Sequence, residues 1–359
     1  MRRARLLYAD DVDTFSDLRG IDYVLWGTGR VAQAFYQKYC VAQKCLQDPL
    51  CWCDNAAHKQ GTEMDGIPVQ SSEKVFELSR VYYLKGRPLA IVIGATGINL
   101  LQIVSQLEQQ AVRAKICSAV QLDAAHYFTE HRRDIEEIST MFADEKSRQL
   151  YRRLIDNMMC GRPVDFSLAE TDQYFSNDVI PSLDDEVFVD AGVCGGEEID
   201  KALTMNSRIR VHAFEPDAQS CGLLREKYSD FPQVVLYPYA LWNEEAQLMF
   251  SGNQATPSAS RLETGADAQG DVIRAMPLDA VLTESPTLIK MDIEGAEYNA
   301  LLGAEQMIRE HHPKLAVCVY HSIEDYIRIP LLIRSFYSGY RFYFRHHSVT
   351  SGESVLYAL

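Results

Sequence analysis

The stretch Val187–Ile199 (VFVDAGVCGGEEI) decides how this chain is organised. It begins as an apolar run that ends in an acid, continues through a glycine-rich turn and closes with a polar start to a helix. This order is typical of a buried parallel strand that leads through a tight loop into the next helix. Such a loop presents backbone N–H groups to a ligand, and its glycines allow the ligand to approach closely.

Strand and helix patterns alternate after this stretch, which predicts a parallel sheet covered by helices. The sequence ends in two β-rich runs, 340–345 and 354–358, joined by a turn that contains Ser351-Gly352, and this predicts an antiparallel hairpin. A parallel sheet with such a hairpin resembles the end of a class I S-adenosylmethionine-dependent methyltransferase fold. The earlier strands are predicted at 187–190, 209–214, 233–237, 287–292 and 314–320.

The first part of the chain predicts a smaller Rossmann-like α/β domain over residues 1–128. Helices are expected through Ala34 and Tyr39, after Ser71, and up to about Gln109, and residues 65–69 are expected to form a turn. Residues 129–175 are expected to form an amphipathic helical connector, which leaves 176–359 as the larger domain. The strands of the smaller domain are predicted at 22–26, 50–53, 89–93 and 114–120.

Composition limits the partners. The net charge is −15, and it is concentrated after residue 128, where 21 Lys and Arg face 37 Asp and Glu. A surface this acidic repels phosphate backbones, so we expect no nucleic-acid partner. No stretch reaches the roughly 20 apolar residues that a membrane helix needs. The nine cysteines fit free thiols in a reducing, cytoplasmic setting. A homo-oligomer is also compatible with the sequence.

The cofactor site is predicted at the carboxyl ends of the first two strands of the larger domain. Asp190 precedes the loop glycines Gly192, Gly195 and Gly196, and Glu215-Pro216 follows the second strand, where an acid can bind ribose hydroxyls. Glu197 and Glu198 stabilise a helix start but repel a pyrophosphate. These residues favour S-adenosylmethionine, which has no phosphate, over a dinucleotide.

A second group of polar residues follows the fourth strand. Lys290 and Asp292 are two residues apart on a strand, so they share a face, and Glu294 and Glu297 come directly after. The carboxyl end of this strand opens on the same ligand crevice. We therefore expect Lys290, Asp292 and Glu294 to belong to the catalytic site.

These motifs resemble the FkbM family of methyltransferases, and the Asp292–Glu297 run is the most distinctive part. The resemblance covers about residues 185–320. The runs Tyr320–Asp325 and Arg345–Ser348 also resemble a bacterial subset of the family that carries an N-terminal Rossmann-like unit. The resemblance implies O-methylation of a sugar or related hydroxylated metabolite, in glycan or secondary-metabolite biosynthesis, with Ala240 also at the cofactor. Val193-Cys194-Gly195 departs from the family pattern. The other matching runs are Phe188–Gly196, Phe214–Pro216, Ala240–Asn243, Ser258–Ser260 and Pro277–Asp279.

A hydroxyl acceptor needs a group that takes its proton. The candidates are His321, Asp292 and His346, and the ordinary pKa of a histidine, about 6.5, suits a base at neutral pH. His321 could instead be a structural histidine. Asp292 could also position the acceptor, or bind a divalent cation together with Glu294, because carboxylate oxygens suit Mg²⁺.

A second glycine loop occurs in the first domain. Gly27-Thr28-Gly29 follows a strand and opens a helix, and Asp54 lies about 25 residues further on, as in a short dinucleotide fingerprint. A nicotinamide or a nucleotide-sugar could bind there, and the alternative function is an NAD-linked oxidoreductase or a nucleotide-sugar-binding protein. A role in packing, dimerisation or acceptor docking is equally open.

Overall fold

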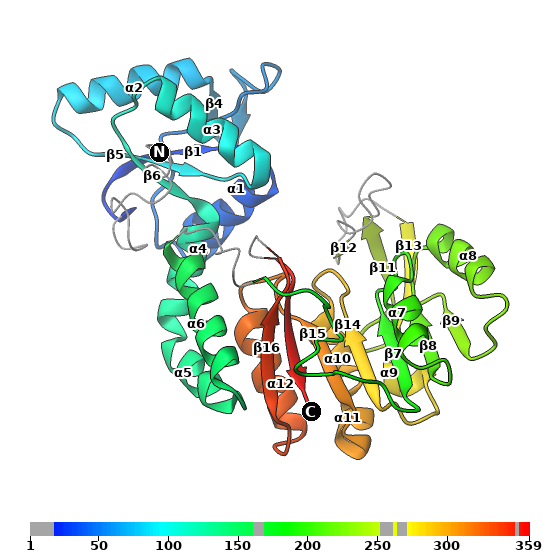
Figure 1. Cartoon of the computed structure of the whole chain (residues 1–359). Coiled ribbons are helices and arrows are strands. Elements are labelled where there is room, and N and C mark those ends of the chain that lie inside the picture. Colours follow the sequence, from blue (N-terminus) through cyan, green and yellow to red (C-terminus); the bar gives the residue numbers. More distant parts are fainter. Residues whose placement is uncertain (1–17, 161–168, 252–260, 264–270, 349–351) are drawn as a thin grey trace. The chain divides into compact units, whose positions relative to one another are not determined.

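The computed structural model describes residues 18–160, 169–251, 261–263, 271–348 and 352–359 (Figure 1). The chain divides into two compact units. Unit 1 contains residues 1–132 and 153–163, and unit 2 contains 133–152 and 164–359. The two units are considered separately below. No helix within the described ranges is both long and apolar enough to cross a membrane.

Unit 1 is built on a six-stranded sheet with the order β3-β4-β2-β1-β5-β6. All neighbours are parallel except β3 and β4, which form a hairpin around Asp65 and Gly66. Residues 65–69 were expected to be only a turn; the expectation missed β4, whose alternating Ile67 and Val69 are buried. The strands are β1 Asp22–Trp26, β2 Cys51–Cys53, β3 Glu63–Met64, β4 Ile67–Gln70, β5 Leu89–Ile93 and β6 Lys115–Ser118.

Helices cover both faces of this sheet. Tyr23 and Leu25 pack with α1 and α4 on one face, whereas Val24 and Trp26 pack with α2 and α3 on the other. The last strand was predicted to reach residue 120, but it ends at Ser118. Ser118 is the N-cap of α4, which begins at the next residue. The helices are α1 Arg30–Tyr36 with the π-helix Gln37–Ala42, α2 Ser72–Leu84, α3 Gly97–Gln109 and α4 Ala119–Glu130.

The predicted connector contains α5, Arg132–Met141, and α6, Glu145–Cys160, which begins in unit 2 and ends in unit 1. A buried arginine of β16 (Phe342–His346) fixes the start of α6 to the sheet of unit 2. Arg345 is 1% exposed and donates to Asp144 at 2.7 Å, to Asp178 at 2.8 Å and to Ser147 at 2.8 Å. These contacts make the first part of the predicted connector a structural part of unit 2.

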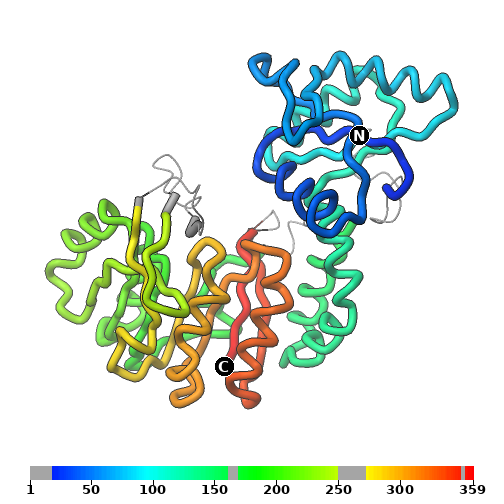
Figure 2. Tube along the Cα trace, turned by 180° about the vertical axis from the view of Figure 1, so that it is seen from behind, coloured from blue at the N-terminus to red at the C-terminus, as the bar shows by residue number. Residues whose placement is uncertain are grey.

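The main sheet of unit 2 has seven strands in the order β16-β17-β15-β14-β7-β8-β9. Five strands are parallel, and the last strand, β17, inserts antiparallel between β15 and β16 (Figure 2). The predicted hairpin at the C-terminus is therefore present, although residues 349–351 of its turn lie outside the described residues. The strands are β7 Val187–Ala191, β8 Arg210–Phe214, β9 Val234–Tyr237, β14 Leu288–Met291, β15 Lys314–Cys318, β16 Phe342–His346 and β17 Ser354–Ala358.

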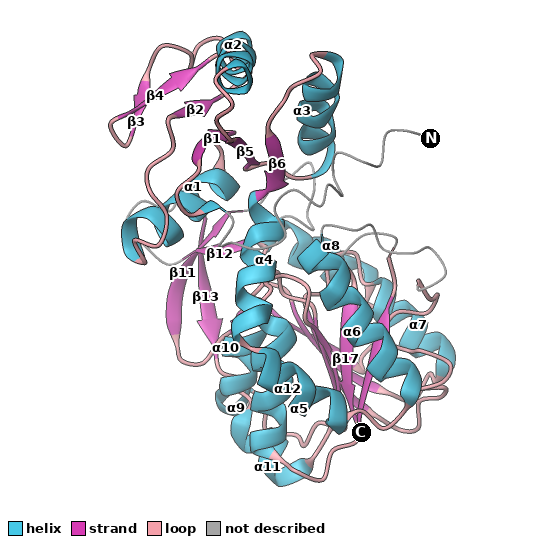
Figure 3. Ribbon diagram, turned by 90° about the vertical axis from the view of Figure 1, so that its left-hand side faces the viewer, coloured by secondary structure: helices cyan, strands magenta, loops and turns pink. Residues whose placement is uncertain are grey.

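Helices lie on both faces of this sheet as well: α7 covers one face, and α10 and α11 cover the other (Figure 3). Phe188, Val211 and Leu288 face α7 and α8 in the larger core cluster, together with Tyr174 and Phe175 from the segment before β7. The helices are α7 Glu197–Met205, α8 Ala218–Lys227, α9 Leu278–Val281, α10 Glu297–Leu302, α11 Glu305–His311 and α12 Asp325–Phe336.

A second, four-stranded sheet in unit 2 was not predicted. Its order is β10-β13-β11-β12, and it packs around Ala240, Leu248, Ile273 and Ala275. The polar run between β11 and β13 hid these strands from sequence analysis; the motif residues Ser258–Ser260 fall in this run, outside the described residues. The strands are β10 Ala240–Leu241, β11 Ala246–Ser251, β12 Arg261–Glu263 and β13 Asp271–Met276.

The loops after β7 and β14 touch at Gly192, and this contact provides a test of the fold. Gly192 has φ +83°, and a Cβ there would lie 1.8 Å from the carbonyl oxygen of Asp292. We expect Gly192→Ala to lower the free energy of unfolding by about 3 kcal/mol or more, because the substitution adds both backbone strain and a clash. Urea unfolding measures the change.

Gly222 provides the matched control, because it lies within α8 and a Cβ there would meet nothing within 4 Å. Gly222→Ala should raise the free energy of unfolding by about 0.5–1 kcal/mol, since alanine is the better helix former. If both variants unfolded with the same free energy, the close approach of the two loops would be wrong.

Candidate functional site

The loop after β7 has the backbone conformations that its glycines permit. Gly192 and Gly196 both have φ +83°, and Cys194 between them has φ +51°. Cys194 and Gly195 are exposed, so the loop is open to a ligand. Gly196 is the N-cap of α7, and Glu197 and Glu198 stand in the first turn of the helix, as predicted. Their carboxylates make this helix start unfavourable for a phosphate.

Asp190 and Lys290 form an ion pair at the base of this loop. The two residues are register partners on β7 and β14, both are almost fully buried, and Lys290 Nζ lies 3.0 Å from Asp190 Oδ1. Lys290 also donates to the carbonyl oxygens of Ala191 at 3.3 Å and Gly192 at 2.7 Å. The ammonium therefore holds the first turn of the loop in place.

The buried pair has perturbed acidities. Burial raises the pKa of Asp190 to about 6, and the nearby Lys290 ammonium limits the rise. Burial would lower the pKa of Lys290, but the carboxylate of Asp190 outweighs it and the pKa is raised. Within the described residues neither oxygen of Asp190 accepts a well-aligned hydrogen bond. A buried carboxylate in this state can accept hydrogen bonds from a ligand that carries donors.

Glu215 connects the second strand to the same loop. It follows β8 and accepts the backbone N–H of Cys194 at 3.1 Å and that of Asp217 at 2.9 Å. Burial raises its pKa, and these two hydrogen bonds oppose the rise. Pro216 follows and is half-buried, while Asp217 caps α8 by accepting from Ser220 N at 2.7 Å. Each Glu215 oxygen has capacity for a further donor, such as a ribose hydroxyl.

Ala240 is buried and lies on β10, where it pairs with Ala275 of the small sheet. This strand begins three residues after β9 ends. Ala240 therefore lies just beyond the carboxyl edge of the main sheet.

Asp292 follows β14 at the same edge of the sheet, and its side chain is 22% exposed. The hydroxyl of Tyr174 donates to Asp292 Oδ2 at 2.5 Å, and the hydroxyl of Tyr320 donates to Oδ1 at 3.2 Å. Sequence reasoning missed Tyr174 as a site residue, because it lies 118 residues before Asp292 and belongs to no motif. Two phenol donors therefore fix the position of the Asp292 carboxylate.

Glu297 organises the turn that follows Asp292. It is fully buried, and its two oxygens accept the backbone N–H groups of Ile293 at 2.7 Å and Gly295 at 3.0 Å. Glu294 and Gly295, with φ +57° and +97°, adopt the left-handed conformations that the turn requires. The last acid of the Asp292–Glu297 run is therefore a structural residue that closes the turn.

His321 joins the acids of this turn from the loop after β15. Its Nδ1 lies 3.0 Å from Glu297, and its Nε2 lies 3.4 Å from Glu294 and 3.5 Å from Asp292. Burial lowers the pKa of His321, but Glu294 and Glu297 outweigh burial and raise the pKa to about 10. The expectation of an ordinary histidine pKa near 6.5 was therefore wrong, because three carboxylates surround the ring. At neutral pH His321 carries a proton, which suits a positioning role rather than that of a free base.

His346, the third candidate base, lies at the end of β16. Its side chain is fully buried, and Nδ1 lies 2.9 Å from Ser354 Oγ on the neighbouring strand β17. This hydrogen bond joins the two strands of the C-terminal hairpin.

Asp292, Glu297 and His321 offer ligand atoms within 4.8 Å of one another, which is close enough to consider a metal ion. Both oxygens of Glu297 already accept backbone N–H groups, however, and a protonated His321 supplies the positive charge that the acids require. The donor set therefore fits a proton on His321 better than it fits a divalent cation.

The glycine loop of unit 1 has part of a dinucleotide-binding geometry. Gly27 has φ +113°, a Cβ on Gly29 would meet nothing within 4 Å, and Gly94 packs against Ala32 of α1. Asp54, however, accepts the hydroxyl proton of Thr28 and lies 3.3 Å from Lys59 Nζ. A ribose would have to compete with these partners for the carboxylate.

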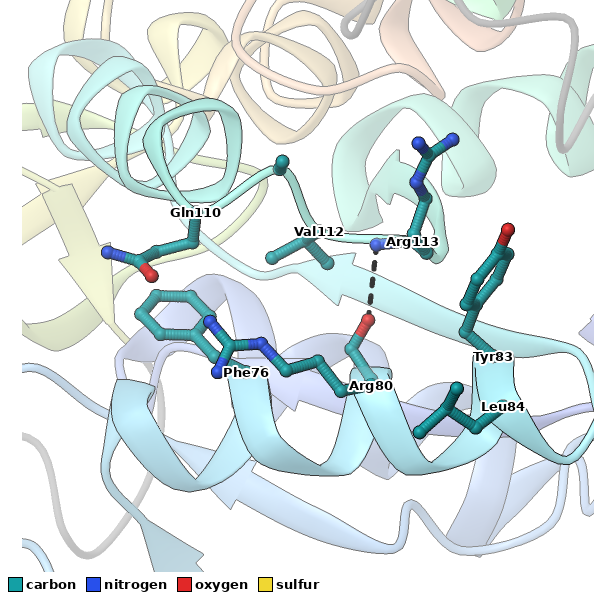
Figure 4. A pocket seen from close by; sticks show the side chains of 9 residues that line it. Phe76, Arg80, Tyr83, Leu84, Gln110, Val112 and Arg113 are labelled. Carbon is teal, nitrogen blue, oxygen red and sulfur yellow. Dashed lines mark hydrogen bonds between the residues drawn. The ribbon is translucent and has the colours of Figure 1, made fainter.

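A cavity of about 280 Å³ in unit 1 lies away from this loop (Figure 4). It is lined by Phe76, Arg80 and Tyr83 of α2 and by residues 110–113, and the backbone N–H of Arg113 donates to Ser79 Oγ at 3.2 Å. Residues 110–113 precede β6, so the cavity lies at the amino edge of the sheet. Ligands of such sheets bind at the opposite, carboxyl edge.

The geometry of unit 2 defines a class of protein: a seven-stranded sheet with an antiparallel last strand, and acidic side chains beside a glycine loop at the carboxyl edge of that sheet. The sequence profile of the methyltransferase FkbM domain matches residues 190–345. This part of the chain is therefore similar to the FkbM methyltransferases, as its sequence motifs indicated.

Solved structures agree with the fold. A structure described as methyltransferase FkbM from Methylobacillus flagellatus KT has a TM-score of 0.61 and 20% identity, covering 95% of this chain and 90% of its own. At this identity the likeness shows the fold, and the predicted α/β class with its methyltransferase sheet is confirmed.

Two further matches have TM-scores too low to carry an argument. One is a fibrillarin from Aeropyrum pernix with bound S-adenosyl-L-methionine (0.33; 10% identity; 49% of this chain and 67% of its own). The other is a precorrin-6y C5,15-methyltransferase from Geobacter metallireducens GS-15 (0.31; 14% identity; 50% and 82%). No curated protein matches the chain.

The raised pKa of His321, about 10, predicts a pH-dependent stability. A proton held more tightly in the folded state stabilises fully below the unfolded pKa of about 6.5, and this contribution is lost as the pH rises toward 10. The difference in unfolding free energy between the wild type and His321→Gln should therefore shrink by about 4 kcal/mol between pH 6 and pH 10. Urea unfolding at the two pH values measures it.

His311→Gln is the control, because His311 is an exposed histidine at the end of α11. The change with pH should be larger for His321→Gln than for His311→Gln. A pH-independent difference for His321→Gln would contradict a proton held by the surrounding acids.

Proposed function

We propose that unit 2 is an S-adenosylmethionine-dependent O-methyltransferase that acts on a hydroxyl group of a sugar or related metabolite. The observation that carries the proposal is the pairing of two sites at one sheet edge. Asp190 and Glu215 offer buried carboxyl oxygens next to the glycine loop, and Asp292 offers a partly exposed carboxyl group beside them. The sugar class rests on the resemblance to the FkbM family alone.

The cofactor residues suit the parts of S-adenosylmethionine. Glu215 would accept hydrogen bonds from the ribose hydroxyls, and the loop Gly192–Gly196 allows close approach of the amino acid part. The acids Asp190, Glu197 and Glu198 favour a cationic ligand, and they disfavour the pyrophosphate of a dinucleotide. Bound S-adenosylmethionine would supply an electrophilic methyl group, which leaves its sulfur when the acceptor oxygen bonds to it.

The protein must align the acceptor and remove its proton. Alignment and exclusion of water supply a large part of the rate enhancement in such transfers. Asp292 is the residue best placed to accept the hydroxyl proton, because Tyr174 and Tyr320 fix the position of its carboxyl group and its side chain is partly exposed. Glu294 would lie beside Asp292 on the acceptor side, and His321 would hold these two acids in place. Lys290 would fix the first turn of the glycine loop.

A nucleotide at the glycine loop of unit 1 is the second candidate. The open space at Gly29 and the tight packing of Ala32 on Gly94 favour it. A nucleotide-sugar bound there would make this domain an acceptor-binding domain, and NAD bound there would point to the alternative oxidoreductase activity.

Calorimetry separates these functions. We expect the wild type to bind S-adenosylmethionine, and Glu215→Gln to lose about 10- to 100-fold in affinity, because an amide replaces an acceptor oxygen in a buried site. Glu226→Gln on the exposed side of α8 is the matched control and should bind as the wild type does. Binding of NAD without binding of S-adenosylmethionine would overturn the proposal, and titration with UDP-N-acetylglucosamine tests unit 1.

Substitution of Asp292 tests the transfer step. With tritiated methyl donor and a panel of rhamnose, inositol and UDP-N-acetylglucosamine, Asp292→Asn should transfer at least about 100-fold less label than the wild type. Its affinity for S-adenosylmethionine should stay within about threefold, since Asp292 serves the acceptor side. Glu305→Gln on α11 is the control, and full turnover by Asp292→Asn would remove Asp292 from the mechanism.

A further inference from the structure

Tyr174 stands in an unusual backbone conformation before β7. It has φ +65°, and Asp172, two residues earlier, has φ +63°. A positive φ is uncommon in any residue except glycine, and for a bulky residue it is a true outlier. Such a conformation persists only where the surroundings fix it, and it concentrates at functional sites.

Contacts on both sides of Tyr174 fix this segment. Asp172 forms an ion pair with Lys201 of α7 at 3.1 Å. The side-chain Nε2 of Gln173 donates to Glu353 at 2.7 Å and to the hydroxyl oxygen of Tyr174 at 2.9 Å. The segment is therefore held to the helix that follows the glycine loop and to the C-terminal hairpin.

The direction of the hydrogen bond from Tyr174 is set by Gln173. The phenol oxygen accepts from the amide, so its own proton is free to point at Asp292 Oδ2, which lies 2.5 Å away. Lys290 Nζ lies 5.0 Å from the centre of the Tyr174 ring, which is a cation–π distance. One buried side chain thus contacts both the lysine of the cofactor loop and the carboxylate on the acceptor side.

We propose that Tyr174 is a positioning residue for Asp292. By donating its proton to Oδ2, it fixes the rotamer of the carboxylate and leaves the remaining lone pairs for the acceptor hydroxyl. This inference rests on the proposed function, in which Asp292 receives the acceptor proton. Its strained backbone is the cost of bringing a residue from before β7 to the end of β14.

Other charged and titratable groups also face Asp292, so the effect of Tyr174 must be isolated from theirs. They are Tyr320 and His321 after β15, Glu294 on its own loop, Cys318 on β15, Lys290 on β14 and Asp190 on β7. A substitution of Tyr174 that keeps its ring leaves all of these in place.

Tyr174→Phe is that substitution, because it removes only the hydroxyl and keeps the ring over Lys290. The test follows the carboxyl carbon-13 signal of Asp292, assigned by its loss in Asp292→Asn, at neutral pH in the full chain without ligand. We expect the chemical shift of this signal to change in Tyr174→Phe, since the carboxylate loses the hydrogen bond from the Tyr174 hydroxyl. The affinity for S-adenosylmethionine should change by less than about threefold.

Tyr340→Phe is the matched control. Tyr340 is also buried and also donates its hydroxyl proton, to the carbonyl oxygen of Pro313 at 2.7 Å. An unchanged Asp292 signal in Tyr174→Phe, or an equal change in both variants, would overturn the inference. Failure of the wild type to bind S-adenosylmethionine would instead overturn the proposed function, because the Asp292 signal is measured without it.

Discussion

The buried ion pair between Asp190 and Lys290 is the interaction on which the site of unit 2 depends. Two charges removed from water are costly, and they are tolerated only as a pair with further hydrogen bonds. Lys290 meets this condition by donating to the carbonyl oxygens of Ala191 and Gly192. Removal of one partner would leave an uncompensated buried charge and cost about 3–5 kcal/mol. The pair thus fixes the point where β7 becomes the glycine loop.

Three loops meet at this edge of the sheet because the carboxyl ends of parallel strands lie on the same side. The glycine loop donates a backbone N–H to Glu215, and Gly192 packs against the carbonyl of Asp292. Beyond Asp292, Glu297 and His321 close the next turn. The parts proposed to bind the cofactor and the acceptor are therefore mechanically connected, and a displacement of Gly192 would reach Asp292 directly.

The sequence predicted those features that depend on short runs of residues. The β7 loop, the acids at the start of α7 and the C-terminal hairpin follow from local patterns of apolar, glycine and charged residues. The four-stranded sheet of β10–β13 did not, because its strands are short and are separated by a polar run. Neither the role of Tyr174 nor that of Arg345 could be predicted, since both depend on contacts between segments more than 100 residues apart. The proton on His321 was missed for the same reason: its pKa follows from three carboxylates that only the fold brings together.

The central claim is that Asp190 and Glu215 hold a nucleoside cofactor beside Asp292, at the carboxyl edge of the main sheet of unit 2. A crystal structure of the protein with S-adenosylhomocysteine tests this claim most directly. We predict that the ribose hydroxyls of the ligand bind Glu215 and that its amino acid part lies along Gly192–Gly196. Its sulfur should face Asp292. A ligand bound at the Gly27–Gly29 loop of unit 1, with the carboxyl edge of the main sheet of unit 2 empty, would contradict the account.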